Sequence, residues 1–241
     1  MSHFLSRLVL SGLALCLLLP VSAPAADWDG KPNHYRVRVD APATRAVVEA
    51  DLWQQSDTLS MYNVMQVPGL ANGQASLVEG LRATDAKGAT VALKDLGEGD
   101  FGIAGGQRIR LSYTVRLEHD RFAWPAGMEE VSYRTDEGVM ATGASLFFAD
   151  GDAPVQAPIE VDFDLPRGWQ ARTPWTSKGE GDRFRVDSRR ELISNALFLG
   201  TAHAETFDAG GVKLTLVLGK RYRKSAPLFV DLLRTQLASY A

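Results

Sequence analysis

The stretch QRIRLSYTVRLEH, residues Gln107 to His119, carries the clearest structural pattern in this chain of 241 residues. Apolar side chains occupy every second position from Ile109 to Leu117, and polar side chains such as Arg110 and Arg116 lie between them. Successive side chains of a β-strand point to opposite faces, so this alternation predicts a strand with one buried face and one solvent-exposed face. The fold is therefore expected to rest on half-buried strands.

The same alternation recurs along most of the chain. It appears in HYRVRVD from His34, in IEVDFDL from Ile159 and in VKLTLVL from Val212. Turn residues separate these runs, at Asn72-Gly73, Lys87-Gly88, Asp150-Gly151-Asp152, Arg167-Gly168 and Gly210-Gly211. Residues 26–219 are therefore predicted to form an all-β, antiparallel β-sandwich, with a long crossing connection around Gly97 to Gly106.

A different period begins at the C-terminal end, in SAPLFVDLLRTQLASYA from Ser225 to Ala241. The three-to-four-residue spacing of its apolar residues predicts an amphipathic α-helix with Ser225 as the N-cap, after a basic linker that starts at Lys220. The predicted apolar face consists of Leu228, Phe229, Leu232, Leu233, Leu237 and Tyr240. An apolar helix face is unfavourable in contact with water, so we expect this face to pack against a following domain or against a protein or peptide partner.

The first 25 residues have the layout of a secretory signal peptide. Arg7 precedes an apolar run from Leu8 to Leu19, and Ala23-Pro24-Ala25 supplies an A-x-A cleavage site, so the mature chain is expected to begin near Ala26. The run of about 12 residues is shorter than the roughly 20 that span a bilayer, so no stable membrane anchor is expected after cleavage. The expected location is the periplasm.

Cysteine content and charge exclude several classes of function. The only cysteine, Cys16, lies inside the signal, so the mature chain has no thiol for a disulfide, for catalysis or for zinc. Without Arg7 the chain carries 25 Lys and Arg against 29 Asp and Glu, a net charge of −4. Nucleic-acid binding needs clustered basic residues, so no nucleic-acid partner is expected.

The sequence has no strong motif for a metal site or a nucleotide-binding site. Histidines of the mature chain, His34, His119 and His203, lie far apart, and no His-Glu-x-x-His pair occurs. GEGDFG from Gly97 fits G-x-G-x-x-G, but its two acidic residues would repel phosphate, and we interpret it as a turn.

Two further short motifs are also interpreted structurally. GASLF from Gly143 lacks the second glycine of a nucleophile elbow, so Ser145 is expected to be an ordinary strand residue. Asp150-Gly151-Asp152 lacks further oxygen ligands for calcium, and we expect a turn. No catalytic, cofactor-binding or metal-binding residue is therefore predicted, and enzymatic activity stays undecided.

Tryptophan side chains allow two interpretations. Exposed indoles can form a platform for a sugar or a peptide, but tryptophans near strand ends or prolines more often pack in the core or at its rim. For Trp53, Trp124, Trp169 and Trp175 we favour core or rim packing.

Three longer stretches resemble a known family. They are SYRTDEGVMATGASLFFADGD from Ser132, PIEVDFDLPRGWQARTPW from Pro158, and RRELISNALFLGTAHAETFDAGGVKLTLVLG from Arg189. Together with the opening HYRVRVD and TRAVVEADL, they resemble the N-terminal β domain of the PDZ-containing glycyl aminopeptidases, peptidase family M61.

The resemblance implies a non-catalytic role. In that family the β domain precedes a helical, thermolysin-like domain that carries His-Glu-x-x-His and zinc, and often a PDZ domain; none of these motifs occurs here. No catalytic residue can be carried over, and zinc is expected only in the missing catalytic domain, whose first helix would be Ser225 to Ala241. Two main hypotheses stay open: a truncated N-terminal domain of an exported zinc-dependent aminopeptidase-like protein, and a stand-alone periplasmic β-sandwich that binds or scaffolds a peptide or protein.

Overall fold

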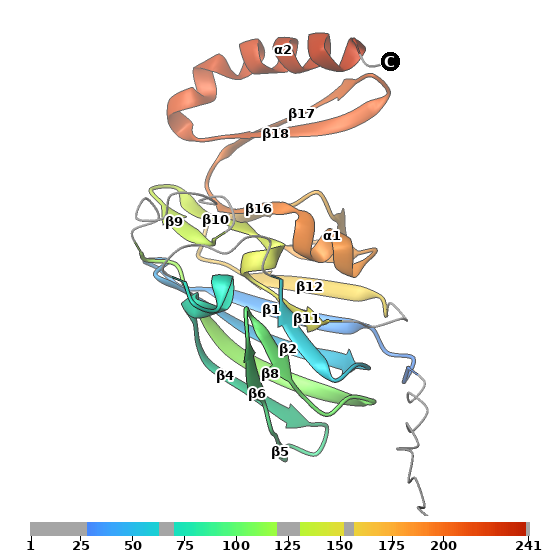
Figure 1. The fold of residues 1–241 in the computed structure, drawn as a ribbon. Coiled ribbons are helices and arrows are strands. Elements are labelled where there is room, and N and C mark those ends of the chain that lie inside the picture. Colours follow the sequence, from blue (N-terminus) through green and yellow to red (C-terminus); the bar gives the residue numbers. More distant parts are fainter. Residues whose placement is uncertain (1–27, 63–69, 120–130, 152–156, 240–241) are drawn as a thin grey trace, which may run out of the picture.

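The computed structural model describes residues 28–62, 70–119, 131–151 and 157–239. The predicted signal peptide, Trp124, Asp152 and Tyr240 lie outside these ranges. Within them the chain is mostly strand, with few helices (Figure 1).

An eight-stranded sheet forms one layer of the molecule, in the order β14-β15-β12-β1-β2-β8-β4-β5. Residues Gln107–Arg116 of the alternating stretch form β8, which pairs antiparallel with β2 and with β4. Every pairing in this sheet is antiparallel except that of β1 with β12, which is parallel. The strands are β1 (Asn33–Val39), β2 (Arg45–Gln54), β4 (Val78–Asp85), β5 (Thr90–Val91), β8 (Gln107–Arg116), β12 (Ile159–Asp164), β14 (Thr176–Ser177) and β15 (Arg183–Val186).

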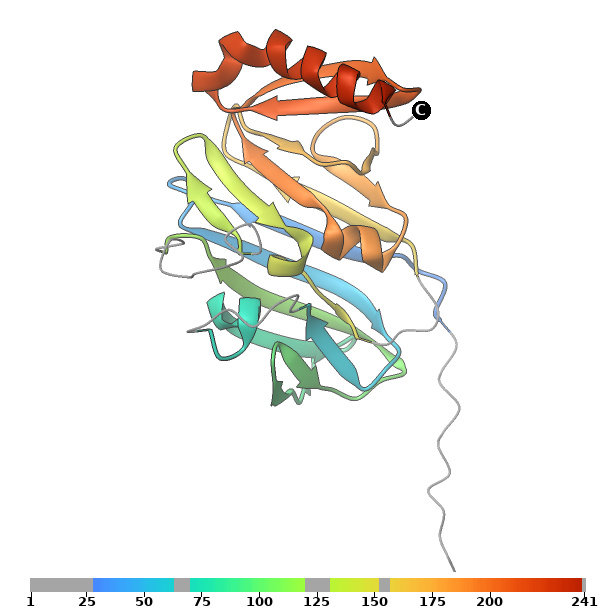
Figure 2. The same cartoon turned by 45° about the horizontal axis from the view of Figure 1, so that its top comes forward.

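Two four-stranded sheets form the second layer over one face of the large sheet (Figures 1 and 2). One has the order β13-β16-β10-β9 and the other β11-β3-β7-β6. Their strands are β3 (Thr58–Met61), β6 (Lys94–Gly97), β7 (Asp100–Gly102), β9 (Tyr133–Thr135), β10 (Gly138–Thr142), β11 (Phe148–Asp150), β13 (Gln170–Arg172) and β16 (Ala196–Gly200). The short helices in this layer are α1 (Arg189–Ser194) and the 3₁₀ helices η1 (Gly73–Leu77) and η4 (Gly143–Ser145). The predicted β-sandwich is thus confirmed.

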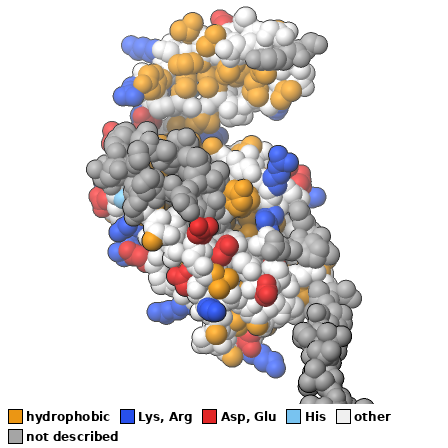
Figure 3. Space-filling view, viewed as in Figure 1, with side chains coloured by type: hydrophobic (Ala, Val, Ile, Leu, Met, Phe, Trp, Pro, Cys, Tyr) orange, Lys and Arg blue, Asp and Glu red, His pale blue; other side chains and the backbone are white. Residues whose placement is uncertain are grey.

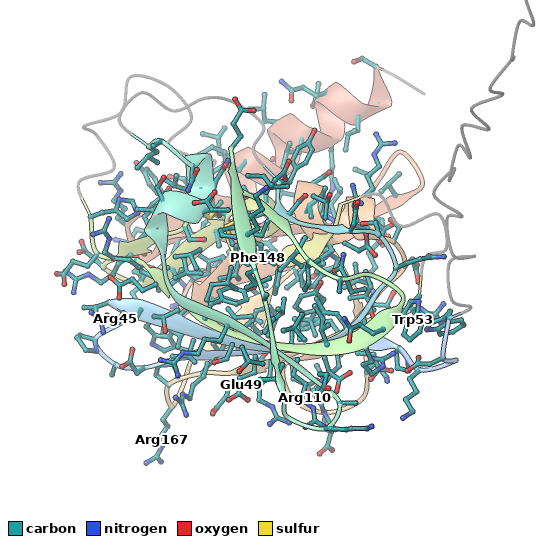
Figure 4. The ribbon with its side chains drawn as sticks, turned by 60° about the horizontal axis from the view of Figure 1, so that its bottom comes forward. Arg45, Glu49, Trp53, Arg110, Phe148 and Arg167 are labelled. Atoms are coloured by element: carbon teal, nitrogen blue, oxygen red, sulfur yellow. The ribbon has the colours of Figure 1, made fainter. Side chains whose placement is uncertain are left out.

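The main core lies between these two layers. Ile109, Leu111 and Tyr113 of β8 are at most 2 % exposed, whereas Arg110 between them is exposed. Figure 4 shows Phe148 of β11 in the interior, with Arg45, Glu49 and Arg110 on the outer face of the large sheet. The apolar residues of the alternating sequence pattern therefore face the core, and the polar residues between them face the solvent.

Two local predictions differ from the structure. The segment 97–106, predicted as a long crossing connection, instead contains the turn of the β6–β7 hairpin and the strand β7. The predicted turn at GEGDFG is present there, with Glu98 in the left-handed region at φ +55°. Ser145 lies in η4 instead of a strand, and its hydroxyl accepts from the Thr142 backbone N–H at 3.3 Å and donates to the Thr142 carbonyl oxygen at 3.0 Å.

Residues 203–238 form a separate unit, which we name the C-terminal module. It contains β17 (His203–Ala209), β18 (Val212–Leu218), the 3₁₀ helix η5 (Lys220–Ser225) and α2 (Ala226–Ala238). The alternation from Val212 predicted a strand of the sandwich, but β18 pairs only with β17, and the hairpin packs against α2 (Figure 1). Its small core, separate from the main one, is formed by Phe207, Ala209, Leu214, Leu216, Val230, Leu233 and Leu237.

None of the helices in the described ranges is long and apolar enough to cross a lipid bilayer.

Candidate functional site

A pocket of about 690 Å³ opens where β1 and β12 begin, beside α1. Six elements or their flanking residues contribute to it: β1, β2, β3, β11, β12 and α1. We name it the Arg190 pocket after the exposed arginine at its rim. Its volume falls in the range of small-molecule and peptide sites. Its main lining residues are Asn33, Tyr35, Trp53, Tyr62, Asp150, Ile159, Arg189, Arg190, Ile193 and Ser194.

Asp150 at the end of β11 is the only acidic residue among the described residues that line this pocket. Its Oδ2 accepts hydrogen bonds from the backbone N–H groups of Gln55, at 2.5 Å, and Ser56, at 3.0 Å. Its Oδ1 accepts a hydrogen bond from the Ser56 hydroxyl. The carboxylate therefore ties the turn after β2 to β11, and its main role is structural.

Two arginines of α1 bring positive charge to the pocket. The Arg189 guanidinium donates to the backbone carbonyl oxygens of Asp150 and Gly151, which holds α1 against β11. Arg190 follows it and is exposed, with no ion pair to any residue that the structure describes. Helix α1 begins after Ser188, whose hydroxyl accepts from the backbone N–H of Glu191 at 3.1 Å, so both arginines lie in its first turn.

Tyr35 lies at the base of the pocket and is 1 % exposed. Its hydroxyl donates to the Phe148 carbonyl oxygen at 2.8 Å, and burial raises the pKa of Tyr35 well above its usual range. The phenol therefore stays protonated at physiological pH and links the two layers of the sandwich.

The structure does not bring the three histidines together. His34 lies 3.0 Å from Asp162 on the large sheet, His119 contacts the Ser132 carbonyl oxygen at 2.7 Å, and His203 lies 3.9 Å from Glu205 in the C-terminal module. Within residues 28–62, 70–119, 131–151 and 157–239, no three His, Cys, Asp or Glu side chains are grouped to hold a metal ion.

The tryptophans divide between core and pocket. Trp175 is 7 % exposed and stacks on Phe163 in the core, and Trp169 is partly buried against the same core. Trp53 lines the Arg190 pocket, and Figure 4 shows it at the end of its strand, away from Phe148. The sequence analysis favoured core or rim packing for Trp53 and did not single out Arg189 or Arg190, because these three residues come together only in the folded chain.

Helix α2 has two apolar faces instead of the single predicted one. Val230 is 3 % exposed and packs on the hairpin with Leu233 and Leu237, whereas Leu228 and Leu232 are 70 % and 50 % exposed. At about 100° per residue, positions 228 and 232 lie nearly opposite 230 and 237. The Ser225 side chain makes no capping hydrogen bond, although Ser225 occupies the N-cap position.

We name the exposed pair Leu228 and Leu232 the outer α2 stripe. Figure 3 shows hydrophobic side chains gathered on the C-terminal module, while charged side chains are scattered over the sandwich. Leu228 and Leu232 lie one helical turn apart, so they form a small apolar surface on the side of α2 that faces away from the hairpin.

Comparison with known proteins agrees with this architecture. No curated protein sequence matches the chain. The structure is similar to the crystal structure of an aminopeptidase N family protein from Idiomarina loihiensis, with a TM-score of 0.66 and 21 % identity. The match covers 86 % of this chain and 36 % of the other, so this chain spans about a third of that protein's length. The family model of the Peptidase M61 N-terminal domain matches residues 34–201, the sandwich from β1 to the end of β16, and the chain belongs to this family.

Proposed function

We propose that this chain acts as the non-catalytic N-terminal domain of an exported, zinc-dependent aminopeptidase-like protein. Two findings support this: the family match over the sandwich, and the likeness to about a third of an aminopeptidase N family protein. In this proposal zinc and peptide hydrolysis belong to a separate catalytic domain, and the sandwich takes no part in the chemistry. The sandwich supplies a rigid support for that domain.

The observation that carries this proposal is the outer α2 stripe. Leu228 and Leu232 point away from the hairpin that covers the rest of the helix, so they are free to pack against a second domain. Burial of a leucine side chain contributes roughly 1.5–3 kcal/mol, so the pair supplies a useful share of a domain interface. We infer that the catalytic domain docks on this stripe.

A second candidate function is a stand-alone periplasmic sandwich that binds a peptide or protein. The observation in its favour is the core of the C-terminal module, because Val230, Leu233 and Leu237 already have partners on β17 and β18. Helix α2 therefore does not need another domain in order to dock.

The coding sequence downstream of Ala241 separates the two hypotheses. We expect an open reading frame for a helical domain with His-Glu-x-x-His, and this domain should bind the 241-residue chain when the two are expressed together. The double variant Leu228→Asp/Leu232→Asp should abolish co-purification. Lys87→Asp/Lys94→Glu changes charge on the sandwich instead and should leave it intact. A stop codon directly after Ala241, or binding unaffected by the Leu double variant, would contradict the proposal.

We also propose export to the periplasm with removal of residues 1–25, on the basis of the charge and apolar pattern around Arg7. The intact mass of the protein from a periplasmic extract tests this. A chain that begins near Ala26 supports it, and a chain that keeps Met1 to Ala25 contradicts it.

A further inference from the structure

We propose that the Arg190 pocket binds a peptide through its C-terminal carboxylate, with the last side chain of the peptide against the apolar wall. This goes beyond the proposed function, because binding here needs no catalytic domain. Charge, hydrogen-bonding capacity and shape each support it.

The charge balance of the pocket favours an anion. Arg189 and Arg190 line it, against Asp150 as the one carboxylate among the lining residues that the structure describes. Asp150 accepts hydrogen bonds from Gln55 and Ser56, and Arg189 donates to neutral carbonyl oxygens, so neither arginine forms a carboxylate ion pair within the described ranges. Among the described lining residues, two arginines therefore face one carboxylate, an excess of one positive charge.

The remaining polar groups at the rim can all donate hydrogen bonds. Asn33 uses its side-chain oxygen to accept from the Trp53 backbone N–H at 2.7 Å, which leaves its NH₂ group for a ligand. Ser194 and Tyr62 are also exposed lining residues, and each carries a hydroxyl that can donate. An ionised carboxylate only accepts hydrogen bonds, and a guanidinium binds it with two parallel N–H···O bonds. Arg190, together with the side-chain donors of Asn33, Ser194 and Tyr62, can therefore bind a carboxylate.

The apolar lining favours a peptide over a small inorganic anion. Trp53, Ile159 and Ile193 line the same pocket as the arginines. A phosphate ion would leave this wall in contact with water, whereas an apolar side chain next to the carboxylate would cover it. The volume of about 690 Å³ accommodates a dipeptide.

The test is a titration of the full chain with N-acetyl-leucyl-phenylalanine, followed by ¹H–¹⁵N NMR spectra that report weak binding and the folded state together. We expect saturable shifts at Trp53 and at residues 189–194. The C-terminal amide of the same dipeptide should bind at least tenfold more weakly, because it lacks the charge. Inorganic phosphate should compete only at a concentration at least tenfold higher.

Matched variants locate the site. Arg190→Gln should weaken binding of the acid about tenfold, which corresponds to about 1.4 kcal/mol, and should not change binding of the amide. Arg190→Lys should fall between wild type and Arg190→Gln, because it keeps the charge but loses the bidentate geometry. Arg185→Gln, which lies on β15 and pairs with Asp187 at 3.1 Å, serves as the control and should bind like wild type. The proposal would be overturned by equal affinities for the acid and the amide, by the lack of a saturable shift, or by unchanged binding of the acid to Arg190→Gln. If phosphate bound as tightly as the dipeptide acid, the assignment of the ligand as a peptide would be wrong.

Discussion

The Glu137 carboxylate accepts two hydrogen bonds from the backbone N–H of Lys220, with its oxygens 2.7 and 2.9 Å from the nitrogen. Glu137 lies in the turn between β9 and β10 of the sandwich, and Lys220 is the first residue of η5. The Glu137 carbonyl oxygen also accepts from the backbone N–H of Thr201 at 2.9 Å. One turn of the sandwich thus holds both ends of the segment that contains the β17–β18 hairpin.

Substitution of Glu137 by Ala should loosen the C-terminal module without unfolding the sandwich. The variant removes the charge-assisted acceptor for the Lys220 N–H, and hydrogen bonds of this kind contribute about 1.5 kcal/mol or more. We expect amide hydrogen exchange at Lys220 to become about tenfold faster, while the main thermal transition stays unchanged. Asp136→Asn in the same turn is the control, and equal exchange rates in both variants would show that the Glu137 contact does not hold the module.

Tyr113→Phe should lower the stability of the sandwich. The Tyr113 hydroxyl donates to the Leu146 carbonyl oxygen at 2.9 Å and accepts from the Phe148 backbone N–H at 3.2 Å, and burial raises the pKa of Tyr113 above its usual range, so it stays protonated. Without the hydroxyl, two buried backbone groups lose a partner, which costs about 1–3 kcal/mol. A domain of this size should then melt several degrees lower. Tyr222→Phe, at a side chain that is 43 % exposed, should melt like wild type.

An ion-pair network near the N-terminal edge of the sandwich should make stability depend on acidic pH. Arg108 Nε lies 2.6 Å from Asp29, and Arg108 Nη1 lies 2.6 Å from Asp51. The hydrogen bond from Arg108 lowers the pKa of Asp29 from 3.8 to about 2. A carboxyl whose pKa is depressed in the folded state stabilises the fold fully above its unfolded pKa, and this contribution disappears as the pH falls toward the folded value.

Asp29→Asn should therefore melt below wild type at pH 5–7, and the difference should shrink between about pH 4 and pH 2. Thermal unfolding followed by circular dichroism across this range measures it. Asp208→Asn, at an exposed position of β17, is the control and should follow wild type throughout. A gap between Asp29→Asn and wild type that stays constant down to pH 2 would rule out titration of Asp29 as its cause.

The strands could be predicted from the sequence because each obeys a local rule. Alternation from Ile109 to Leu117 predicted β8 and its buried face, and the GEGDFG turn follows from glycines that occupy left-handed conformations on either side of Glu98. The parallel pairing of β1 with β12 could not be predicted in this way, because it joins Asn33 to Ile159 across about half of the chain. Pairing of distant strands depends on the whole fold.

The residues of the Arg190 pocket were harder to predict from the sequence than the strands. Trp53 comes from β2 and Arg190 from α1, and no spacing in the sequence connects them. The face of α2 was also only partly predicted, because counting its leucines put Leu228 and Leu233 on one side and passed over Val230. Which apolar side chain a helix buries depends on the surface beside it, here Phe207 and Leu214 of the hairpin.

Alanine substitutions on the two faces of α2 should have different effects. Val230→Ala leaves a cavity in the small core of the C-terminal module and should destabilise it by about 1–2 kcal/mol, whereas Leu228→Ala removes an exposed side chain and should change stability by less than about 0.5 kcal/mol. Amide hydrogen exchange in β17, β18 and α2 measures both effects separately from the sandwich core. If Leu228→Ala speeds exchange as much as Val230→Ala, the outer α2 stripe is already covered in the isolated chain. Because a covered stripe has no free surface for a catalytic domain, that result would favour the stand-alone binding protein over the docking domain.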